Sequence, residues 1–200
     1  MGRGPTPKKQ ETHDRIVRTA AAAIRRHGFD GLSVAEIMDE AGLTHGGFYA
    51  HFPSRDAMLA EALDQGAGES LDRLSKASDG ARPEDALDAV VEAYLSDRHL
   101  AAPDKGCTLA ALGSETCRQT PEVRRVMTRR VRELADMLGR QLPGWGEPGR
   151  HEDALAAMSA MVGAMVIARA VDDPSLAKAV RAAAAKLVHD GVSARPRKKH

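Results

Sequence analysis

The chain has 200 residues, of which 42% are hydrophobic and 28% are charged, which is the composition of a soluble protein large enough to bury one or two cores. Its formal net charge of +1 does not by itself indicate a nucleic-acid binder, and its two cysteines cannot form a disulfide framework. No apolar run approaches the ~18 residues of a membrane span, and the N-terminus lacks the apolar core of a signal peptide. We therefore expect a cytoplasmic protein with no membrane partner.

Basic residues gather at both ends of the chain. They are Arg3, Lys8 and Lys9 among glycines and prolines at the start, and Arg195, Arg197, Lys198 and Lys199 at the end. Two interpretations stay open for these ends: unstructured segments that aid solubility, or, for the N-terminal arm, contact with a DNA minor groove or phosphate.

The first predicted helix covers residues 11–27. Ile16, Ala20, Ala23 and Ile24 recur at helical spacing and predict a buried stripe. Gly28 follows directly, at the position where glycine commonly ends a helix.

Residues 33–52 predict two short helices joined by a tight turn. Ser33 and Glu36 have the spacing of a capping box, which satisfies free backbone N–H groups at a helix start. Gly42 suits the left-handed residue after the first helix, and Thr44 is a good N-cap for the second. Pro53 ends that second helix. Helix, short turn and helix form the layout of a helix-turn-helix, whose second helix enters the DNA major groove.

The second helix has the surface of a binding element rather than of a packing element. Gly46 and Gly47 each cost up to ~1 kcal/mol relative to alanine, but they allow close approach to another surface. Tyr49 and Arg55 offer groups that hold phosphates, Arg55 at a helix N-terminus, and His45 is the candidate for a base contact. The predicted DNA-binding residues are Ser33, Thr44, His45, Gly46, Gly47, Tyr49, His51 and Arg55.

The run LTHGGFYAHFPSRDAML, with HGFDGLSVAEIMDEAG before it, resembles the DNA-binding signature of the tetracycline-repressor (TetR) family of bacterial transcriptional regulators. Arg55 departs from the family's more common lysine, and Gly47 stands where many members carry a hydroxyl. The resemblance implies an all-α protein of about nine helices: an N-terminal three-helix bundle with the helix-turn-helix, then a larger helical ligand-binding and dimerisation domain. We place the first domain at residues 1–53 and the second, which begins with the connecting helix, at residues 54–200.

The remaining sequence predicts helices over residues 54–76, 84–100, 105–119, 120–141, 150–170 and 175–189. Gly66 and Gly68 weaken the middle of the first of these, as a hinge or as an ordinary tolerated bend. The resemblance implies a homodimer through the last two helices, where small and apolar residues lie at helical spacing. The predicted interface residues are Ala160, Gly163, Ala164, Leu176, Val180 and Leu187.

The middle helices are predicted to hold a pocket for a largely hydrophobic effector, because methionines are frequent and aromatic residues make up only 3% of the chain. The predicted lining residues are Tyr94, Cys107, Leu109, Met127, Val131 and Met161. Arg125, Arg129 and Arg132 are an alternative site for an acidic ligand, although a solvated helix face is the commoner role for such residues.

Enzymatic motifs are missing: the sequence has no phosphate-binding glycine loop, no HExxH and no nucleophile elbow. We therefore expect no enzyme, no cofactor and no metal site. The favoured function is a repressor that a small molecule releases from a palindromic operator in double-stranded DNA. The alternatives are an electrophile or redox sensor acting through Cys107 at a helix start, an activator or a regulator without a ligand, and an enzyme or metal protein with a similar bundle.

Overall fold

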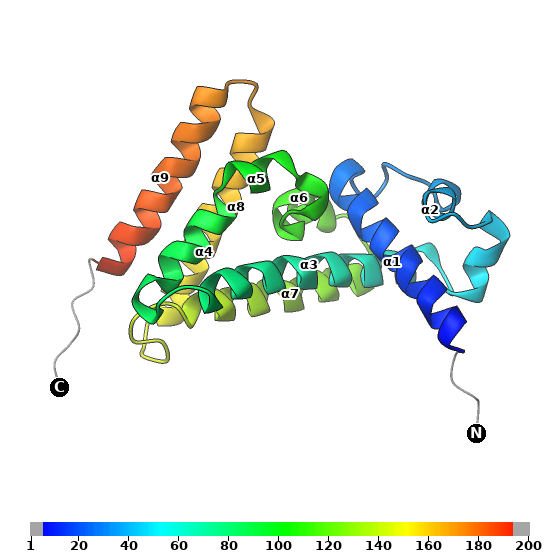
Figure 1. The fold of residues 1–200 in the computed structure, drawn as a ribbon, viewed down its shortest axis with the longest axis horizontal. Coiled ribbons are helices and arrows are strands. Elements are labelled where there is room, and N and C mark those ends of the chain that lie inside the picture. The colour runs from blue at the N-terminus through cyan, green and yellow to red at the C-terminus, as the bar shows by residue number, and fades with distance from the viewer. Residues whose placement is uncertain (1–5, 194–200) are drawn as a thin grey trace.

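The computed structural model describes residues 6–193, and in that range the secondary structure is helical throughout (Figure 1). The α-helices there are α1 (Pro7–His27), α2 (Val34–Glu40), α3 (Arg55–Asp79), α4 (Ala86–Tyr94), α5 (Asp97–Ala101), α6 (Thr108–Thr116), α7 (Pro121–Gly139), α8 (Arg150–Ala170) and α9 (Pro174–Ser193). Short 3-10 helices are η1 (His45–Ala50), η2 (Pro83–Asp85) and η3 (Pro103–Lys105). The expected all-α class is confirmed.

A first core joins the N-terminal helices to the middle of the chain. Helices α1, α2 and η1 lie at one end of the molecule, and α3 runs from them toward α8 and α9 (Figure 1). Ile16, Phe29 and Phe48 belong to this core, and Leu112 of α6 and Met127 of α7 complete it. The N-terminal bundle is therefore packed directly against α6, and α7 joins the same core through α3 and α6.

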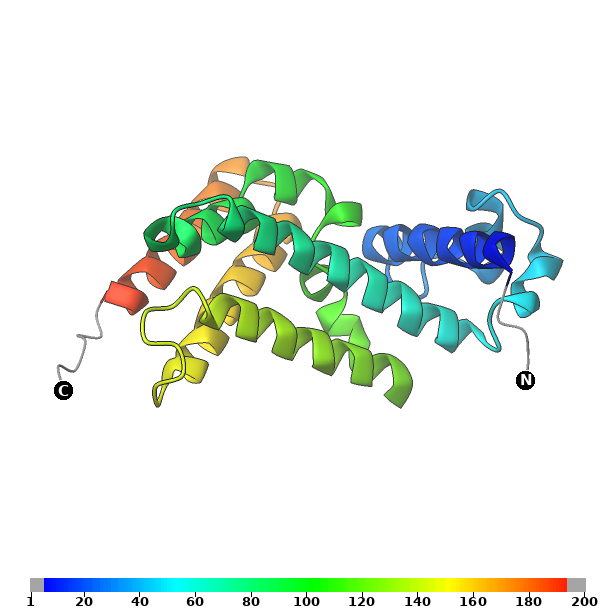
Figure 2. The same cartoon turned by 60° about the horizontal axis from the view of Figure 1, so that its bottom comes forward.

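A second core lies among α4, α7, α8 and α9. Tyr94, Leu138, Met161 and Ala164 are buried in it. Helices α3 and α7 run side by side along the molecule, as the turned view makes clear (Figure 2). The two cores meet at α6 and α7, because Leu109 of α6 and Val131 of α7 pack against both.

Several predicted boundaries were wrong for local reasons. Helix α1 begins at Pro7, so Lys8 and Lys9 are helical rather than part of an unstructured arm. Proline suits the first turn of a helix, where its missing N–H costs nothing. The predicted helix over residues 84–100 divides, because Ser96 accepts a hydrogen bond from His99 N and starts α5 separately. Arg3, Arg195, Arg197, Lys198 and Lys199 lie outside the described residues.

The second helix of the helix-turn-helix is a 3-10 helix rather than the expected two turns of α-helix. Its N-cap residue Thr44 makes no side-chain capping bond. Gly46 and Gly47 lower the helix propensity of a six-residue segment that Pro53 prevents from growing. Short segments of this kind commonly adopt the tighter 3-10 form.

Among the described residues, one helix, α8, is long and apolar enough to cross a membrane by length and composition alone, which is weak evidence of a span. The helix packs against α7 and α9, and Ala154, Met158 and Met165 are among its buried residues. These residues belong to the second core, while Val166 and Ile167 of the same helix are exposed.

His99 holds the connection between α5 and α6. Its Nδ1 lies 2.5 Å from the Tyr94 carbonyl oxygen, and its Nε2 accepts a hydrogen bond of 2.8 Å from Cys107 N–H. This pair of partners requires a neutral ring, because one nitrogen must donate and the other must accept. The pKa of His99 is lowered to about 4, chiefly by burial; the bond to the Tyr94 carbonyl opposes the shift, and the positive charges of Arg169 and Arg73 add to it.

The depressed pKa of His99 predicts a loss of stability in mild acid. The unfolded chain binds a proton at this residue near pH 6.5, whereas the folded chain resists it until about pH 4. The contribution of His99 is therefore complete above pH ~6.5 and is lost as the pH falls toward 4, with about 2 kcal/mol lost by pH ~5.

Urea unfolding at fixed protein concentration, near neutral pH and again near pH ~5, measures this loss. His99→Gln should lose about 2 kcal/mol less than the wild type between the two conditions. The matched control is His45→Gln, at an exposed position, which should follow the wild type. An equal loss in His99→Gln and the wild type would contradict the assignment.

Candidate functional site

The start of α2 and the turn from α2 to η1 form as the sequence predicts. The Ser33 hydroxyl accepts from Glu36 N–H at 3.2 Å, and the Glu36 carboxylate accepts from Ser33 N–H at 2.7 Å. These hydrogen bonds from Ser33 lower the pKa of Glu36. Gly42 has φ +68°, the left-handed conformation expected of a residue after a helix end. The capping box fixes where α2 starts, and Gly42 fixes where the chain turns toward η1.

Helix η1 is anchored by one face and open on the other. Phe48 is 1% exposed and stacks on Phe52 with ring centroids 5.5 Å apart. Tyr49, next to it, is 73% exposed. A Cβ atom added at Gly46 would meet nothing within 4 Å, so internal packing does not require glycine there. Glycine at this position leaves a bare backbone surface that an external partner can approach closely.

Five of the predicted DNA-binding residues lie together on one short segment, and Ser33 and His51 lie outside it. Thr44, His45, Gly46 and Tyr49 are exposed and Gly47 is half-buried along the same short segment. Ser33 uses its hydroxyl in the capping box. His51 is half-buried, and its ring lies 6.1 Å from that of His13 on α1. Burial lowers the pKa of His51, and the charges of His13 and Lys9 add to the effect.

Arg55 has partners within the chain. Its guanidinium donates to the Phe29 carbonyl oxygen and lies 3.3 Å from the Asp30 carboxylate. Its side chain is 34% exposed. A phosphate bound by Arg55 would share this guanidinium with Phe29 and Asp30, so the phosphate role of Arg55 stays a prediction.

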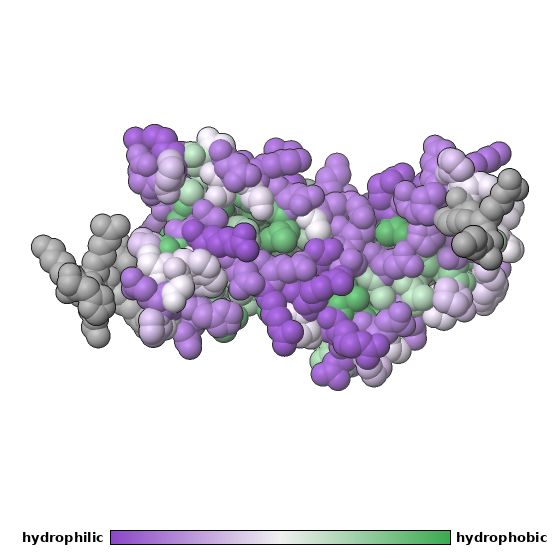
Figure 3. Space-filling view, turned by 90° about the horizontal axis from the view of Figure 1, so that it is seen from below, coloured by the Kyte–Doolittle hydropathy of each residue, from purple (hydrophilic) through white to green (hydrophobic). Residues whose placement is uncertain are grey.

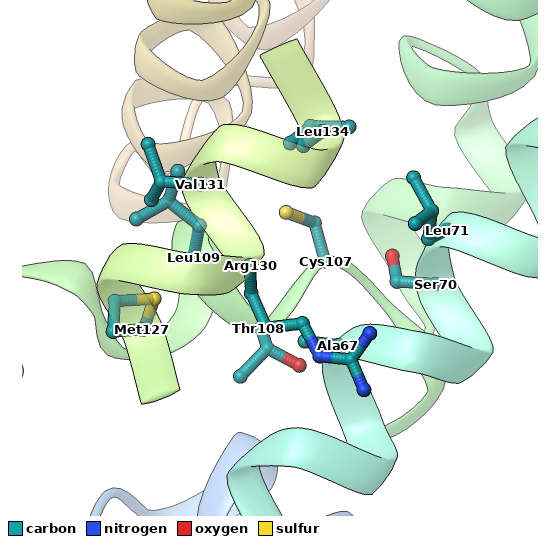
Figure 4. Close-up of a pocket in the computed structure, with 10 residues that line it drawn as sticks. All are labelled: Ala67, Ser70, Leu71, Cys107, Thr108, Leu109, Met127, Arg130, Val131 and Leu134. Carbon is teal, nitrogen blue, oxygen red and sulfur yellow. The ribbon is translucent and has the colours of Figure 1, made fainter. Parts of the chain in front are cut away.

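A small pocket lies between α3, the start of α6 and α7 (Figure 4). Its volume is about 20 Å³, enough for one water-sized sphere. Four of the six predicted lining residues surround it: Cys107, Leu109, Met127 and Val131. Tyr94 and Met161 do not line it, because both are buried in the second core.

Sequence reasoning missed six lining residues, which are Ala67, Ser70, Leu71, Thr108, Arg130 and Leu134. Ala67, Ser70 and Leu71 share the i, i+3, i+4 spacing of one helix face, a signal that was available in the sequence. Arg130 Nη1 donates to Glu133 at 2.7 Å, and its Nε donates to Asp64 on α3 at 2.5 Å. Arg130 therefore joins α7 to α3 at the edge of the pocket.

The other arginines of α7 lie away from this pocket. Arg125, Arg129 and Arg132 are exposed, and Arg129 pairs with Asp64 and Glu133. The face of the molecule in Figure 3 is largely hydrophilic, with small separate apolar areas. The arginine row is therefore a surface feature and does not line the pocket.

Cys107 is the N-cap residue of α6 and is 4% exposed. The buried Tyr94 hydroxyl lies beside its thiol, and burial together with this contact raises the pKa of Tyr94 well above its ordinary value. The guanidinium groups of Arg73 and Arg169 are near enough to act on Cys107, and burial lowers the pKa of both arginines. Cys117 is exposed at the opposite end of α6.

Helices α8 and α9 present an apolar outer surface. Val166, Ile167, Leu176 and Leu187 are exposed large apolar residues on these two helices. Gly163 faces open space, because a Cβ atom there would meet nothing within 4 Å.

Three of the predicted interface residues pack against the second core. Ala164 is 5% exposed and belongs to this core, because the helix turns it inward one residue further along α8 than Gly163; its contact with a partner stays a prediction. Ala160 and Val180 are half-buried and also pack against this core.

Comparisons with known proteins agree with this architecture. Residues 16–62 match the bacterial regulatory proteins of the tetR family. The uncharacterised HTH-type transcriptional regulator Rv0196 of Mycobacterium tuberculosis is 28% identical over 169 residues, covering 80% of this chain and 85% of that protein. Bacillus subtilis YerO, another uncharacterised HTH-type transcriptional regulator, is 29% identical over 90 residues, which are 44% of this chain and 31% of YerO.

The fold is shared with solved structures. The crystal structure of reduced Escherichia coli NemR has a TM-score of 0.75 to this chain at 18% identity, covering 90% of this chain and 96% of NemR. The helix-turn-helix match lies on the segment that carries the capping box, Gly42 and η1. The chain belongs to the TetR family of bacterial transcriptional regulators.

Proposed function

We propose that this protein is a cytoplasmic, homodimeric repressor that leaves its operator DNA when a small molecule occupies the pocket between α3, α6 and α7. The observation that carries the proposal is η1, whose glycines leave a bare backbone beside the exposed Tyr49. We assign DNA binding to residues 1–53, and ligand binding and dimerisation to residues 54–200.

Pairing of two copies supports sequence-specific binding. One short recognition element reads few bases, whereas a twofold dimer reads two half-sites about one helical turn apart. The exposed apolar residues of α8 and α9 supply a surface for such pairing, because self-complementary apolar faces are typical of twofold dimers. The open space at Gly163 leaves room for a partner helix to approach.

The pocket supports a largely apolar effector. Leu71, Leu109, Met127, Val131 and Leu134 form apolar walls, and their side chains must move before a molecule larger than water can enter. An effector releases DNA only if it binds more tightly to the form of the dimer that no longer fits the operator.

A second candidate effector is an electrophile that reacts with Cys107. The observation that favours it is the position of the thiol, which lines the pocket beside the Tyr94 hydroxyl and near two guanidinium groups. With a quinone, the thiolate sulfur forms a bond to a ring carbon, the displaced π electrons move to the carbonyl oxygen, and that oxygen takes a proton.

The first prediction concerns DNA contacts. Tyr49→Ala should weaken binding to a duplex selected from random double-stranded DNA by about fivefold, because a lost phosphate contact is worth roughly 1 kcal/mol. Arg55→Ala should also weaken binding and should lower the salt dependence of log K by about one ion if its guanidinium binds a phosphate. His45→Ala should change the preferred sequence more than the overall affinity.

Gel-shift titrations at several fixed salt concentrations measure all three effects. Arg125→Ala, at an exposed position on α7, is the matched control for a lost surface charge. Unchanged affinity in both Tyr49→Ala and Arg55→Ala would overturn the proposed DNA interface.

The second prediction concerns dimerisation. Gly163→Leu should weaken the dimer by roughly 5- to 150-fold, because overpacking a close helix contact costs about 1–3 kcal/mol. Sedimentation equilibrium over a concentration series gives the dissociation constant. Arg132→Leu, at an exposed position on α7, is the control. A wild-type protein that is monomeric at micromolar concentration would refute the dimer outright.

The third prediction concerns Cys107. In a Cys117→Ser background, a benzoquinone should modify Cys107 at neutral pH and reduce DNA affinity, while the same protein carrying Cys107→Ser should stay bound. Mass spectrometry identifies the modified residue, and gel shift measures the affinity. Modification of Cys107 with no change in DNA binding would show that the effector acts without this thiol.

A further inference from the structure

Two hydrogen bonds from different helices meet on the backbone of Phe29, the second residue after α1. The Phe29 N–H donates to the Glu115 carboxylate of α6 at 2.9 Å, and the Phe29 carbonyl oxygen accepts from the Arg55 guanidinium at the start of α3. The Phe29 side chain is 1% exposed and is fixed in the first core. One peptide segment thus links the last turn of α6 to the residues that follow the recognition helix.

Gly28 makes room for the carboxylate. A Cβ atom at this position would lie 2.8 Å from both oxygens of Glu115. Gly28 also has φ +82°, which favours glycine. A side chain at position 28 would displace the Glu115 carboxylate, so glycine at the end of α1 leaves free the space that this carboxylate occupies.

Helix stability does not explain Glu115. The residue lies in the last turn of α6 and faces the last turn of α1, and a negative charge is unfavourable at both helix C-termini. The two arginines at the end of α1 bind other carboxylates. The buried Arg25 pairs with Glu69. The more exposed Arg26 pairs with Glu40 and Asp104. What Glu115 contributes is the bond to Phe29.

The opposite end of α6 is part of the pocket. Cys107, Thr108 and Leu109, at the start of this nine-residue helix, line the pocket between α3 and α7 (Figure 4). Glu115 follows two turns later on the same helix. Because a hydrogen-bonded helix moves as a unit, a shift of its first turn also moves Glu115 relative to Phe29.

We propose that Glu115 is a positioning residue: its bond to Phe29 sets the orientation of the helix-turn-helix relative to the pocket. A molecule that displaces the start of α6 pulls on this bond and reorients the helix-turn-helix through Phe29 and Arg55. The effect on DNA affinity rests on the proposed function, whereas the effect on orientation does not.

A matched pair of substitutions isolates the hydrogen bond. Glu115→Met keeps the length of the side chain and its helix propensity but removes the acceptor, whereas Glu115→Gln retains an acceptor oxygen for Phe29 N–H. Glu115→Ala is the second acceptor-free variant if the methionine does not fit. Glu122→Met, at an exposed position in the first turn of α7, is the control.

Orientation is measured without DNA or effector. Spin labels at Asp39→Cys on α2 and Arg132→Cys on α7, in a Cys107→Ser and Cys117→Ser background, report the distance between the two regions by pulsed electron paramagnetic resonance. Diluting the labelled chain with unlabelled chain removes distances between subunits. Glu115→Met and Glu115→Ala should shift or broaden the distance distribution, while Glu115→Gln and Glu122→Met should retain the wild-type distribution. A wild-type distribution in both acceptor-free variants, or an equal change in Glu115→Gln, would overturn the proposal.

DNA affinity supplies the second readout. Glu115→Met should bind the selected duplex about fivefold or more weakly than Glu115→Gln, with both variants folded and dimeric at the concentration used. If the protein binds no DNA, the proposed function fails while the spin-label result still decides the role of Glu115. If the distance distribution changes and the affinity does not, the bond positions the helix-turn-helix without controlling DNA binding, and the regulatory part of the inference is wrong.

Discussion

The structure depends on a buried arginine that fastens the first helix to the long helix α3. Arg25 of α1 is 6% exposed, donates to the Gly66 carbonyl oxygen at 2.9 Å and pairs with Glu69. A Cβ atom at Gly66 would lie 3.0 Å from this guanidinium and 3.1 Å from the Thr108 hydroxyl. Removing Glu69 while Arg25 stays buried would leave an uncompensated charge, which costs several kcal/mol, so the contact fixes α1 against α3. Gly66 is tightly packed at the junction of α1, α3 and α6, which gives a more specific reason for this glycine than a hinge.

Features that depend on near neighbours in the sequence were predictable. The capping box of Ser33 and Glu36 and the left-handed Gly42 follow from a few adjacent residues, and both are present. Apolar spacing also identified most of the helices and, together with the family resemblance, Leu109, Met127 and Val131 of the pocket lining. Spacing does not give the rotation of a helix about its own axis to within one residue. For this reason Ala164 was placed in the dimer interface and Tyr94 in the pocket lining, although both are buried in the second core.

Features that depend on distant residues were not predictable. The bonds from Arg55 to Phe29, from Phe29 to Glu115 and from Arg130 to Asp64 join positions separated by 26, 86 and 66 residues. In the sequence alone, Glu115, Arg130 and Asp64 are ordinary charged residues of helix surfaces, and Arg55 was predicted to bind a phosphate. Their partners exist only because α3 brings α1, α6 and α7 together. The link between the pocket and the helix-turn-helix therefore becomes visible in the packing and not in any motif.

The size of the pocket constrains how an effector can act. A volume of about 20 Å³ accepts a single water-sized sphere, so the structure has its pocket nearly closed. An effector must then bind a form in which the walls have separated, and its apparent affinity falls in proportion to the rarity of that form. The three walls have different attachments. Helices α3 and α7 are joined by Arg130 and Asp64, whereas the nine-residue α6 is attached to the N-terminal bundle through Leu112 in the first core and through Glu115. Helix α6 is the shortest of the three walls and the one that carries Glu115, so its movement is the one that reaches Phe29.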